Sequence, residues 1–224
     1  WLRDVVDPGA SYTLALWNDV PAGPGNPFSH PGVLLWAKSY GPGTYAICPF
    51  ATVPEPFFQP DGLQLGFSTN LYYLCFDLDL SEPMVQQGSV NAPTNYWVSV
   101  NVQPSPNGVP FGWKTSSLLY NDAAVWTPAP FPPPPGTWNP LFFANTNVNL
   151  AFKITTLTNQ PPPVGCVETN GTKYVQWPNL QGGLDVWDNG PWVLADDFLC
   201  TNNGPVTDIH LWGSWLFDQM DTNL

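Results

Sequence analysis

The chain has 224 residues, of which 43% are hydrophobic and 15% aromatic, so it can bury a sizeable core and is not globally disordered. Its 28 prolines and 19 glycines exclude a helical bundle, because proline removes a backbone donor and clashes inside a helix. Five basic residues against 17 acidic ones give a net charge of −12, which excludes nucleic-acid binding and counts against docking on anionic lipid.

Short strands with one buried face are predicted along most of the chain, because apolar and polar residues alternate with a period of two. In chain order these strands are Tyr12–Trp17, Val33–Ser39, Thr44–Cys48, Gln64–Phe67, Leu71–Leu78, Tyr96–Val102, Val109–Lys114, Ala123–Thr127, Val148–Ile154, Lys173–Gln176, Trp192–Cys200 and Ile209–Trp215. Turn-forming proline, glycine and asparagine segments separate them. The pattern predicts an all-β fold, an antiparallel β-sandwich of Ig-like or jelly-roll topology.

Two proline-rich tracts have different predicted roles. Pro128–Pro140 is typical of a stiff surface loop in polyproline II form. Asn159–Gly165 is typical of a short rigid spacer. The spacer divides the chain into a body, residues 1–158, and a tail, residues 166–224, with residues 159–165 between them.

Four cysteines indicate two disulfides and a location outside the cytosol, at the cell surface or beyond it. Pairing by nearest neighbours in the chain favours Cys48 with Cys75 and Cys166 with Cys200, while buried thiols are the alternative. Asn170 begins an N-glycosylation sequon, which has meaning only in a chain exported through a glycosylating route.

The two ends of the chain resemble each other. Trp1–Pro8 aligns with Trp215–Thr222, and Trp, Leu and both Asp residues are identical. We expect from this match that the last strand runs into the segment with which another copy of the unit begins. The tail would then be the front of a domain whose body is residues 1–158.

Several blocks resemble a secreted bacterial family of domains of unknown function, which often occurs as repeats in large surface proteins. The most specific blocks are Val193–Cys200 with Gly204–Trp215, and Phe111–Ser116. Further blocks are Leu14–Gly23, Ala51–Phe58, Asp122–Trp126 and Leu150–Thr155. In that family the Asp-Asp-Phe block precedes the Leu-Ala-Phe block, whereas here it follows, so the resemblance implies a permuted order. It supplies no catalytic residues.

A sandwich body without its first strands would be completed either by its own tail or by the tail of a neighbour. The second arrangement, which the stiff spacer favours, is a head-to-tail contact between copies that does not close and therefore builds a filament. We expect a structural subunit of an extracellular filament or surface repeat polymer, with the chain itself as partner. The residues expected to fill the groove are Trp192, Leu194, Phe198, Ile209, Leu211 and Trp215.

The alternative function is a carbohydrate-binding module, because flat aromatic rings stack on sugar rings. The candidate tryptophans are Trp36, Trp97, Trp126, Trp138, Trp177, Trp187 and Trp212, and for each of them packing in the core or at an interface is the more ordinary role.

No enzymatic activity and no cofactor are expected. His30 and His210 are interpreted as surface or packing residues. Three carboxylate pairs could support glycoside hydrolysis: Asp77/Asp79, Asp185/Asp188 and Asp196/Asp197. Adjacent strand residues point to opposite faces, so the last pair cannot serve one bond. Asp77 and Asp79 share a face and would suit Ca²⁺. A solvated acidic face is the simpler interpretation of each pair.

Overall fold

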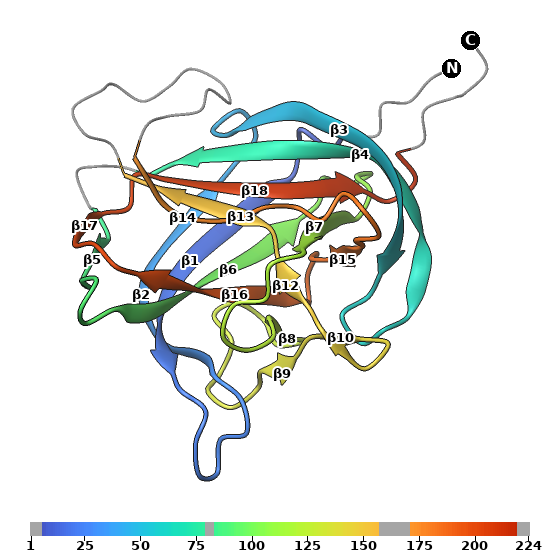
Figure 1. Ribbon diagram of the computed structural model, residues 1–224. Helices are drawn as coiled ribbons and strands as arrows, with labels where there is room; N and C mark the ends of the chain where they lie inside the picture. Colours follow the sequence, from blue (N-terminus) through green and yellow to red (C-terminus); the bar gives the residue numbers. More distant parts are fainter. Residues whose placement is uncertain (1–5, 79–82, 157–170, 219–224) are drawn as a thin grey trace.

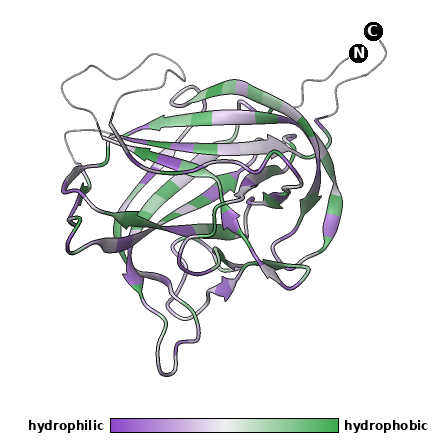
Figure 2. Ribbon diagram, viewed as in Figure 1, coloured by the Kyte–Doolittle hydropathy of each residue, from purple (hydrophilic) through white to green (hydrophobic). Residues whose placement is uncertain are grey.

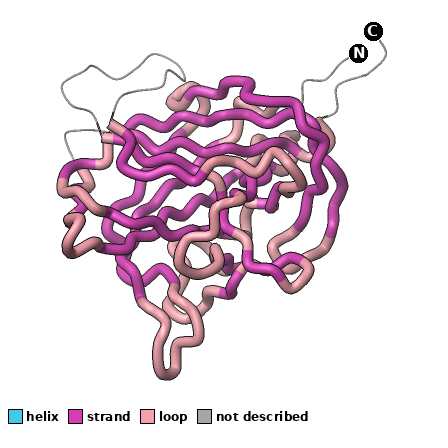
Figure 3. Tube along the Cα trace, in the orientation of Figure 1, coloured by secondary structure: helices cyan, strands magenta, loops and turns pink. Residues whose placement is uncertain are grey.

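The computed structural model describes residues 6–78, 83–156 and 171–218, which form strands and loops without a helix (Figure 3). Two large sheets face each other across a common core (Figure 1). The predicted all-β, antiparallel sandwich is therefore confirmed.

The first sheet has six antiparallel strands. In spatial order they are β2 (His30–Tyr40), β1 (Ser11–Val20), β6 (Thr94–Gln103), β16 (Val193–Cys200), β8 (Val125–Thr127) and β9 (Asn139–Pro140). The strand β16 comes from the predicted tail and lies in the middle, paired with β6 on one side and β8 on the other.

The second sheet has eight strands. In spatial order they are β12 (Asn149–Leu150), β7 (Phe111–Ser116), β15 (Asp185–Trp187), β3 (Ala46–Phe58), β4 (Gln64–Asp77), β18 (Asp208–Trp215), β13 (Phe152–Thr155) and β14 (Thr172–Gln176). Because β18 pairs with β7 as well as with β4, the strands β7, β15, β3, β4 and β18 form a closed ring. The pairing of β15 with β3 is parallel.

Two short two-stranded sheets accompany the large ones. The strand β5 (Val85–Gln86) pairs with β17 (Gly204–Pro205), and β10 (Phe142–Phe143) pairs with β11 (Thr146–Asn147).

The core between the sheets is built by the predicted alternation, which Figure 2 shows as hydrophobic and hydrophilic bands along the strands. Leu14 and Val100 of the first sheet belong to the same buried cluster as Phe76, Leu211 and Trp215 of the second. Each side chain of this kind stabilises the fold by roughly 1.5–3 kcal/mol when it leaves water.

The outer face of the first sheet is covered by the proline-rich loop. Trp17 packs edge-on against Phe131 and Trp138, with ring centroids 6.1 and 6.2 Å apart. The tract Pro128–Pro140 is thus a packed cover, and its last two residues form β9.

The longest strands differ from their predicted bounds. The two strands predicted at Gln64–Phe67 and Leu71–Leu78 merge into β4, which ends at Asp77. The strand predicted at Thr44–Cys48 begins at Ala46 and continues to Phe58 as β3. The pairing of β3 with β4 has three register shifts. Such bulges bend a strand and tolerate proline, which explains how β3 holds three prolines and still curves round to meet β15.

The tail lies in the sandwich of its own chain, which is one of the two arrangements expected. Five of the six residues expected to fill a groove are fully buried there: Leu194, Phe198, Ile209, Leu211 and Trp215. Trp192 is half-buried and packs against Trp126 at 5.2 Å. Residues 159–165, Cys166 and Asn170 lie outside the described residues.

The predicted cysteine pairing is wrong. Cys48 is disulfide-bonded, whereas Cys75 and Cys200 are buried thiols. In the register of β3 and β4, Cys48 lies opposite Tyr73 and Cys75 lies opposite Ala46. Diagonal neighbours are about 7–8 Å apart, and a disulfide needs Cβ atoms about 3.5–4.5 Å apart. Nearness in the chain therefore did not decide the pairing.

Candidate functional site: a buried charge cluster inside the closed ring

The interior of the closed ring holds three charged side chains from three neighbouring strands. Glu55 comes from β3, Lys114 from β7 and Asp185 from β15, and none of them is more than 4% exposed. We call these three residues the buried charge cluster. Asp185 lies directly opposite Lys114 in the antiparallel pair β15–β7, so both side chains leave the sheet on the same face.

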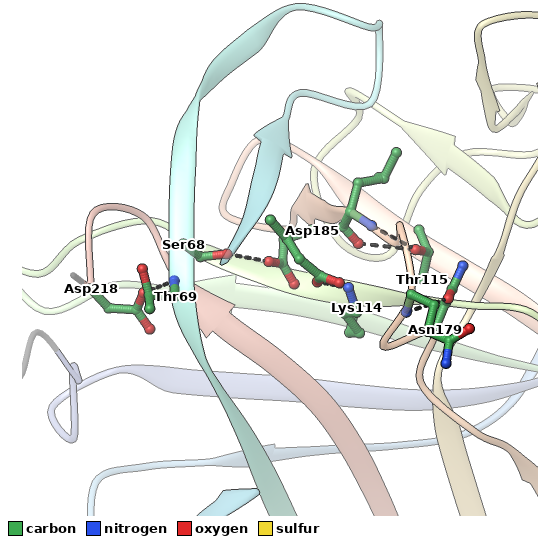
Figure 4. A network of polar contacts seen from close by, with 10 residues as sticks. Ser68, Thr69, Lys114, Thr115, Asn179, Asp185 and Asp218 are labelled. Carbon is green, nitrogen blue, oxygen red and sulfur yellow. Dashed lines mark hydrogen bonds and ion pairs between the residues drawn. The ribbon is translucent and has the colours of Figure 1, made fainter. Parts of the chain in front are cut away.

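The contacts within the cluster are direct. Lys114 Nζ forms an ion pair with Glu55 Oε2, and the Ser68 hydroxyl donates to Asp185 Oδ2 (Figure 4). Among the described residues, Glu55 Oε1 and Asp185 Oδ1 are buried without a hydrogen-bond partner. Lys114 Nζ has three donors, and among the described residues its polar contact is the ion pair with Glu55.

Burial shifts the pKa values of Lys114 and Asp185 in the directions that favour their uncharged forms. It lowers the pKa of Lys114 to about 8, with the charge of Asp185 opposing the change. Burial also raises the pKa of Asp185, against the effects of Lys114, Ser68 and Ser214. Desolvation disfavours any charged group, so an amine and a carboxylic acid both become less ionised inside the ring.

Asp218 follows β18 and binds to the backbone of β4, where its carboxylate accepts from the N–H of Thr69 at 2.6 Å and of Asn70 at 3.2 Å (Figure 4). Burial raises the pKa of this carboxyl to about 7. The loop after β14 lies beside Lys114 and is bonded to β7, where the Asn179 N–H donates to the Thr115 carbonyl at 2.9 Å (Figure 4).

Gly183 and Gly112 have no side chain and so make room for the buried charge cluster. A Cβ atom on Gly183 would lie 2.5 Å from Lys114 Nζ. A Cβ atom on Gly112 would lie 2.5 Å from the ring of Phe57 and 2.9 Å from Asp185 Cβ. The cluster therefore sits in a tightly packed interior with little access to solvent.

Sequence reasoning named only Asp185 of this cluster, and paired it with Asp188. The structure separates these two residues: Asp188 accepts from the Leu194 N–H at 3.3 Å in the sandwich core. Lys114 and Glu55 were missed as site residues. The available signal was that Lys114, one of five basic residues in the chain, ends a predicted strand.

The pair Asp196/Asp197 has the predicted opposite orientation. Asp196 accepts from the Leu150 N–H at 2.5 Å and from Gln176 Nε2 at 2.7 Å, while Asp197 accepts from Asn121 Nδ2 at 2.6 Å. Burial raises the pKa of Asp196 well above its ordinary value and that of Asp197 to about 7. These two carboxyls do not converge on one bond.

The other candidate polar residues are also occupied within the fold. Asp77 lies opposite Asp208, and Asp79 is outside the described residues. His210 stacks on Tyr73 with centroids 5.1 Å apart, and His30 Nδ1 contacts the Pro31 carbonyl at 2.9 Å. Within residues 6–78, 83–156 and 171–218, no group of three or more His, Cys, Asp or Glu side chains is placed to hold a metal ion.

Most of the candidate tryptophans pack inside the molecule. Trp97, Trp138 and Trp212 are buried, Trp36, Trp126 and Trp187 are partly buried, and Trp177 alone among the seven is exposed, at 52%. Trp177 and Phe50 both contact Trp212, with centroids 5.4 and 5.7 Å away, from opposite sides of the outer face of the second sheet.

The fold and this cluster define an all-β sandwich domain with a lysine and two carboxyl groups buried inside a closed ring of strands. The chain belongs to a family described as a domain of unknown function (DUF7901), whose model matches residues 1–155 and 172–224. Searches of the curated proteins and of the solved structures find no significant match. In the described part of the chain, no helix has the length and apolarity needed to cross a membrane.

Proposed function

We propose that this chain is a structural module of an extracellular or cell-surface protein, and that copies of it associate with one another. The observation that carries the proposal is the strand β2, which lies at the edge of the first sheet and carries three consecutive exposed apolar residues, Val33, Leu34 and Leu35. An exposed, apolar edge strand is a template for pairing with another chain.

The inward placement of the ionisable groups supports a structural role over an enzymatic one. A catalytic group must contact its substrate, and the buried charge cluster is at most 4% exposed. The disulfide at Cys48 supports an oxidising compartment, where such bonds persist.

Head-to-tail strand complementation remains the form of assembly suggested by the tail. It would exchange β16 and β18 for the same strands of a neighbour. Because β18 pairs with β4, β7 and β13, and β16 with β6 and β8, both strands would have to leave the centre of their sheets. Such an exchange would accompany folding, whereas edge pairing through β2 would be reversible in the folded protein.

The test measures the mass of the purified assembly by light scattering and its shape by electron microscopy over a range of concentrations. We expect oligomers or fibres, and we expect Val33→Lys to disperse them. Val90→Lys is the matched control, since Val90 is 78% exposed but lies in a loop outside the β2 edge.

Two outcomes contradict parts of the proposal. Monomers at every concentration would contradict self-association. Fibres that form only on refolding, and that Val33→Lys does not disperse, would contradict pairing through β2. They would favour exchange of the tail strands.

Carbohydrate binding is the second candidate, favoured by the exposed Trp177 and by Phe50, which is 42% exposed. Calorimetric titration with soluble polysaccharides tests it. Saturable heat that Trp177→Ala abolishes and Leu180→Ala retains would support a sugar platform, and absence of heat in the wild-type protein would contradict it.

A further inference from the structure

We propose that the side chains of Lys114 and Glu55 react to form an intramolecular amide bond, which covalently joins β7 to β3, with Asp185 as the acid–base group. The reaction would be a modification of the chain by its own residues and does not depend on the proposed assembly.

The first argument is the contact itself. Lys114 Nζ and Glu55 Oε2 form an ion pair, so the nucleophile lies beside the carboxyl group that it would attack. Neighbouring strands hold both side chains inside the closed ring, since β15 pairs with β7 on one side and with β3 on the other. Holding two reactants in this way converts a bimolecular step into an intramolecular one.

The second argument is the unsatisfied hydrogen bonding of the unreacted pair. An ammonium group has three donors and a carboxylate has two acceptor oxygens, but Glu55 Oε1 is buried without a hydrogen-bond partner among the described residues. An amide has one N–H and one carbonyl and no charge. The reaction therefore removes two buried charges, two N–H donors and one acceptor oxygen from an interior where unpaired polar groups are costly.

The third argument is the protonation state. Burial lowers the pKa of Lys114 to about 8, which makes the free amine available near neutral pH. Burial raises the pKa of Asp185, and its Oδ1 is buried without a partner in the described chain. Asp185 can therefore take a proton with one oxygen and give one with the other.

The atoms balance without any co-reactant. A proton moves from the Lys114 ammonium to the Glu55 carboxylate, and the free amine attacks Glu55 Cδ to form the new C–N bond. Asp185 removes a proton from the nitrogen and gives one to the departing hydroxyl. The C–O bond breaks, one water molecule leaves, and no electron is gained or lost. The absence of bulk water in the ring opposes the reverse hydrolysis.

The test is the intact mass of the purified, reduced and denatured protein. We expect the wild-type chain to be lighter than its sequence by the mass of one water molecule. A wild-type chain of full mass would overturn the proposal whether or not any variant folds.

Trypsin gives a second readout, because Lys114 is the only basic residue between Lys38 and Lys153. An acylated Lys114 is not cleaved, so we expect one peptide of residues 39–153 that lacks the mass of one water. Separate peptides 39–114 and 115–153 would overturn the proposal. A peptide 39–153 joined to residues 174–224 would assign the acyl group to Asp185 and would overturn the role of Glu55.

Variants assign the roles. Glu55→Gln should lose ammonia in place of water, and Glu55→Ala and Lys114→Arg should keep their full mass. Asp185→Asn should slow the mass loss or abolish it, and complete water loss in this variant would overturn the acid–base role of Asp185. Lys38→Arg, at a lysine outside the closed ring, should still lose one water.

Discussion

Asp77 and Asp208 lie directly opposite each other in the antiparallel pair of β4 and β18. Two hydroxyl groups, from Thr155 and Thr207, donate to Asp208 at 2.6 and 2.7 Å. Partial desolvation of Asp77, whose side chain is still exposed to solvent, followed by its interaction with the nearby Asp208 carboxyl, raises the pKa of Asp77 from 3.8 to about 6.

This pair makes the stability of the fold depend on pH. Because the pKa of Asp77 is higher in the folded chain than in the unfolded one, its contribution to stability is complete below the unfolded pKa and is lost as the pH rises through about 6. Asp197 and Asp218, each with a pKa raised to about 7, act in the same direction. We expect the melting temperature to fall between about pH 4 and pH 7.

The variant Asp77→Asn should reduce this fall, since it removes one of the titrating groups. Val90→Asn, at an exposed position, is the control and should leave the pH dependence unchanged because it removes no titrating group. Scanning calorimetry at a series of pH values measures the effect. A melting temperature that rises steadily over this range would contradict the raised pKa values.

The tail strand β18 should contribute to the free energy of unfolding as other buried strands do. Leu211 is fully buried and lies opposite Leu74 and Phe152, so Leu211→Ala should lower the free energy of unfolding by about 2–5 kcal/mol. Val90→Ala, at an exposed loop position, should change it by less than about 0.5 kcal/mol. Urea unfolding of the monomer measures both. Equal stability of the two variants would show that β18 is not docked in its own sandwich in solution.

Asp196 should stabilise the fold by accepting hydrogen bonds from buried N–H groups. Asp196→Ala leaves the Leu150 N–H, the Asp197 N–H and the Gln176 amide without their acceptor, at about 1–3 kcal/mol for each buried donor. Asp196→Asn keeps one acceptor oxygen and should cost less than half as much. Chemical denaturation of both variants compares them, and equal losses would mean that packing rather than hydrogen bonding is the role of this side chain.

The proline-rich loop should stabilise the first sheet through its aromatic residues. Trp138 is buried against Trp17, so Trp138→Ala should cost about 3–5 kcal/mol. Trp177→Ala removes the same side chain from an exposed position and should cost less than about 1 kcal/mol. Thermal unfolding compares the variants. A Trp138→Ala protein as stable as Trp177→Ala would mean that the loop does not pack on the sheet.

The positions of the strands were predictable because alternation is a local property. Tyr96–Val102 and Ile209–Trp215 alternate cleanly, and both lie in strands with buried inward faces, β6 and β18. The bounds of β3 were not predictable. Its prolines interrupt the alternation, and the bulges that accommodate them depend on the pairing with β4.

The buried charge cluster was not predictable for a related reason. Lys114 is followed by Thr115 and Ser116 in a strand that is buried on both faces, so its sequence shows no alternation that would mark an inward lysine. Glu55 is isolated among aromatic and proline residues. The two meet because β15 pairs with both of their strands, one of them in parallel.

The amino-acid sequence by itself determined the class of fold, the large apolar core, the acidic charge and the positions of most strands, since composition and periodicity act within a few residues. Only the tertiary structure decided where the tail strands lie, which cysteine is oxidised and which charges meet inside the closed ring. Those outcomes depend on strand order and register, which pair segments far apart in the chain, and a shift of one residue in register would turn Lys114 and Glu55 to opposite faces.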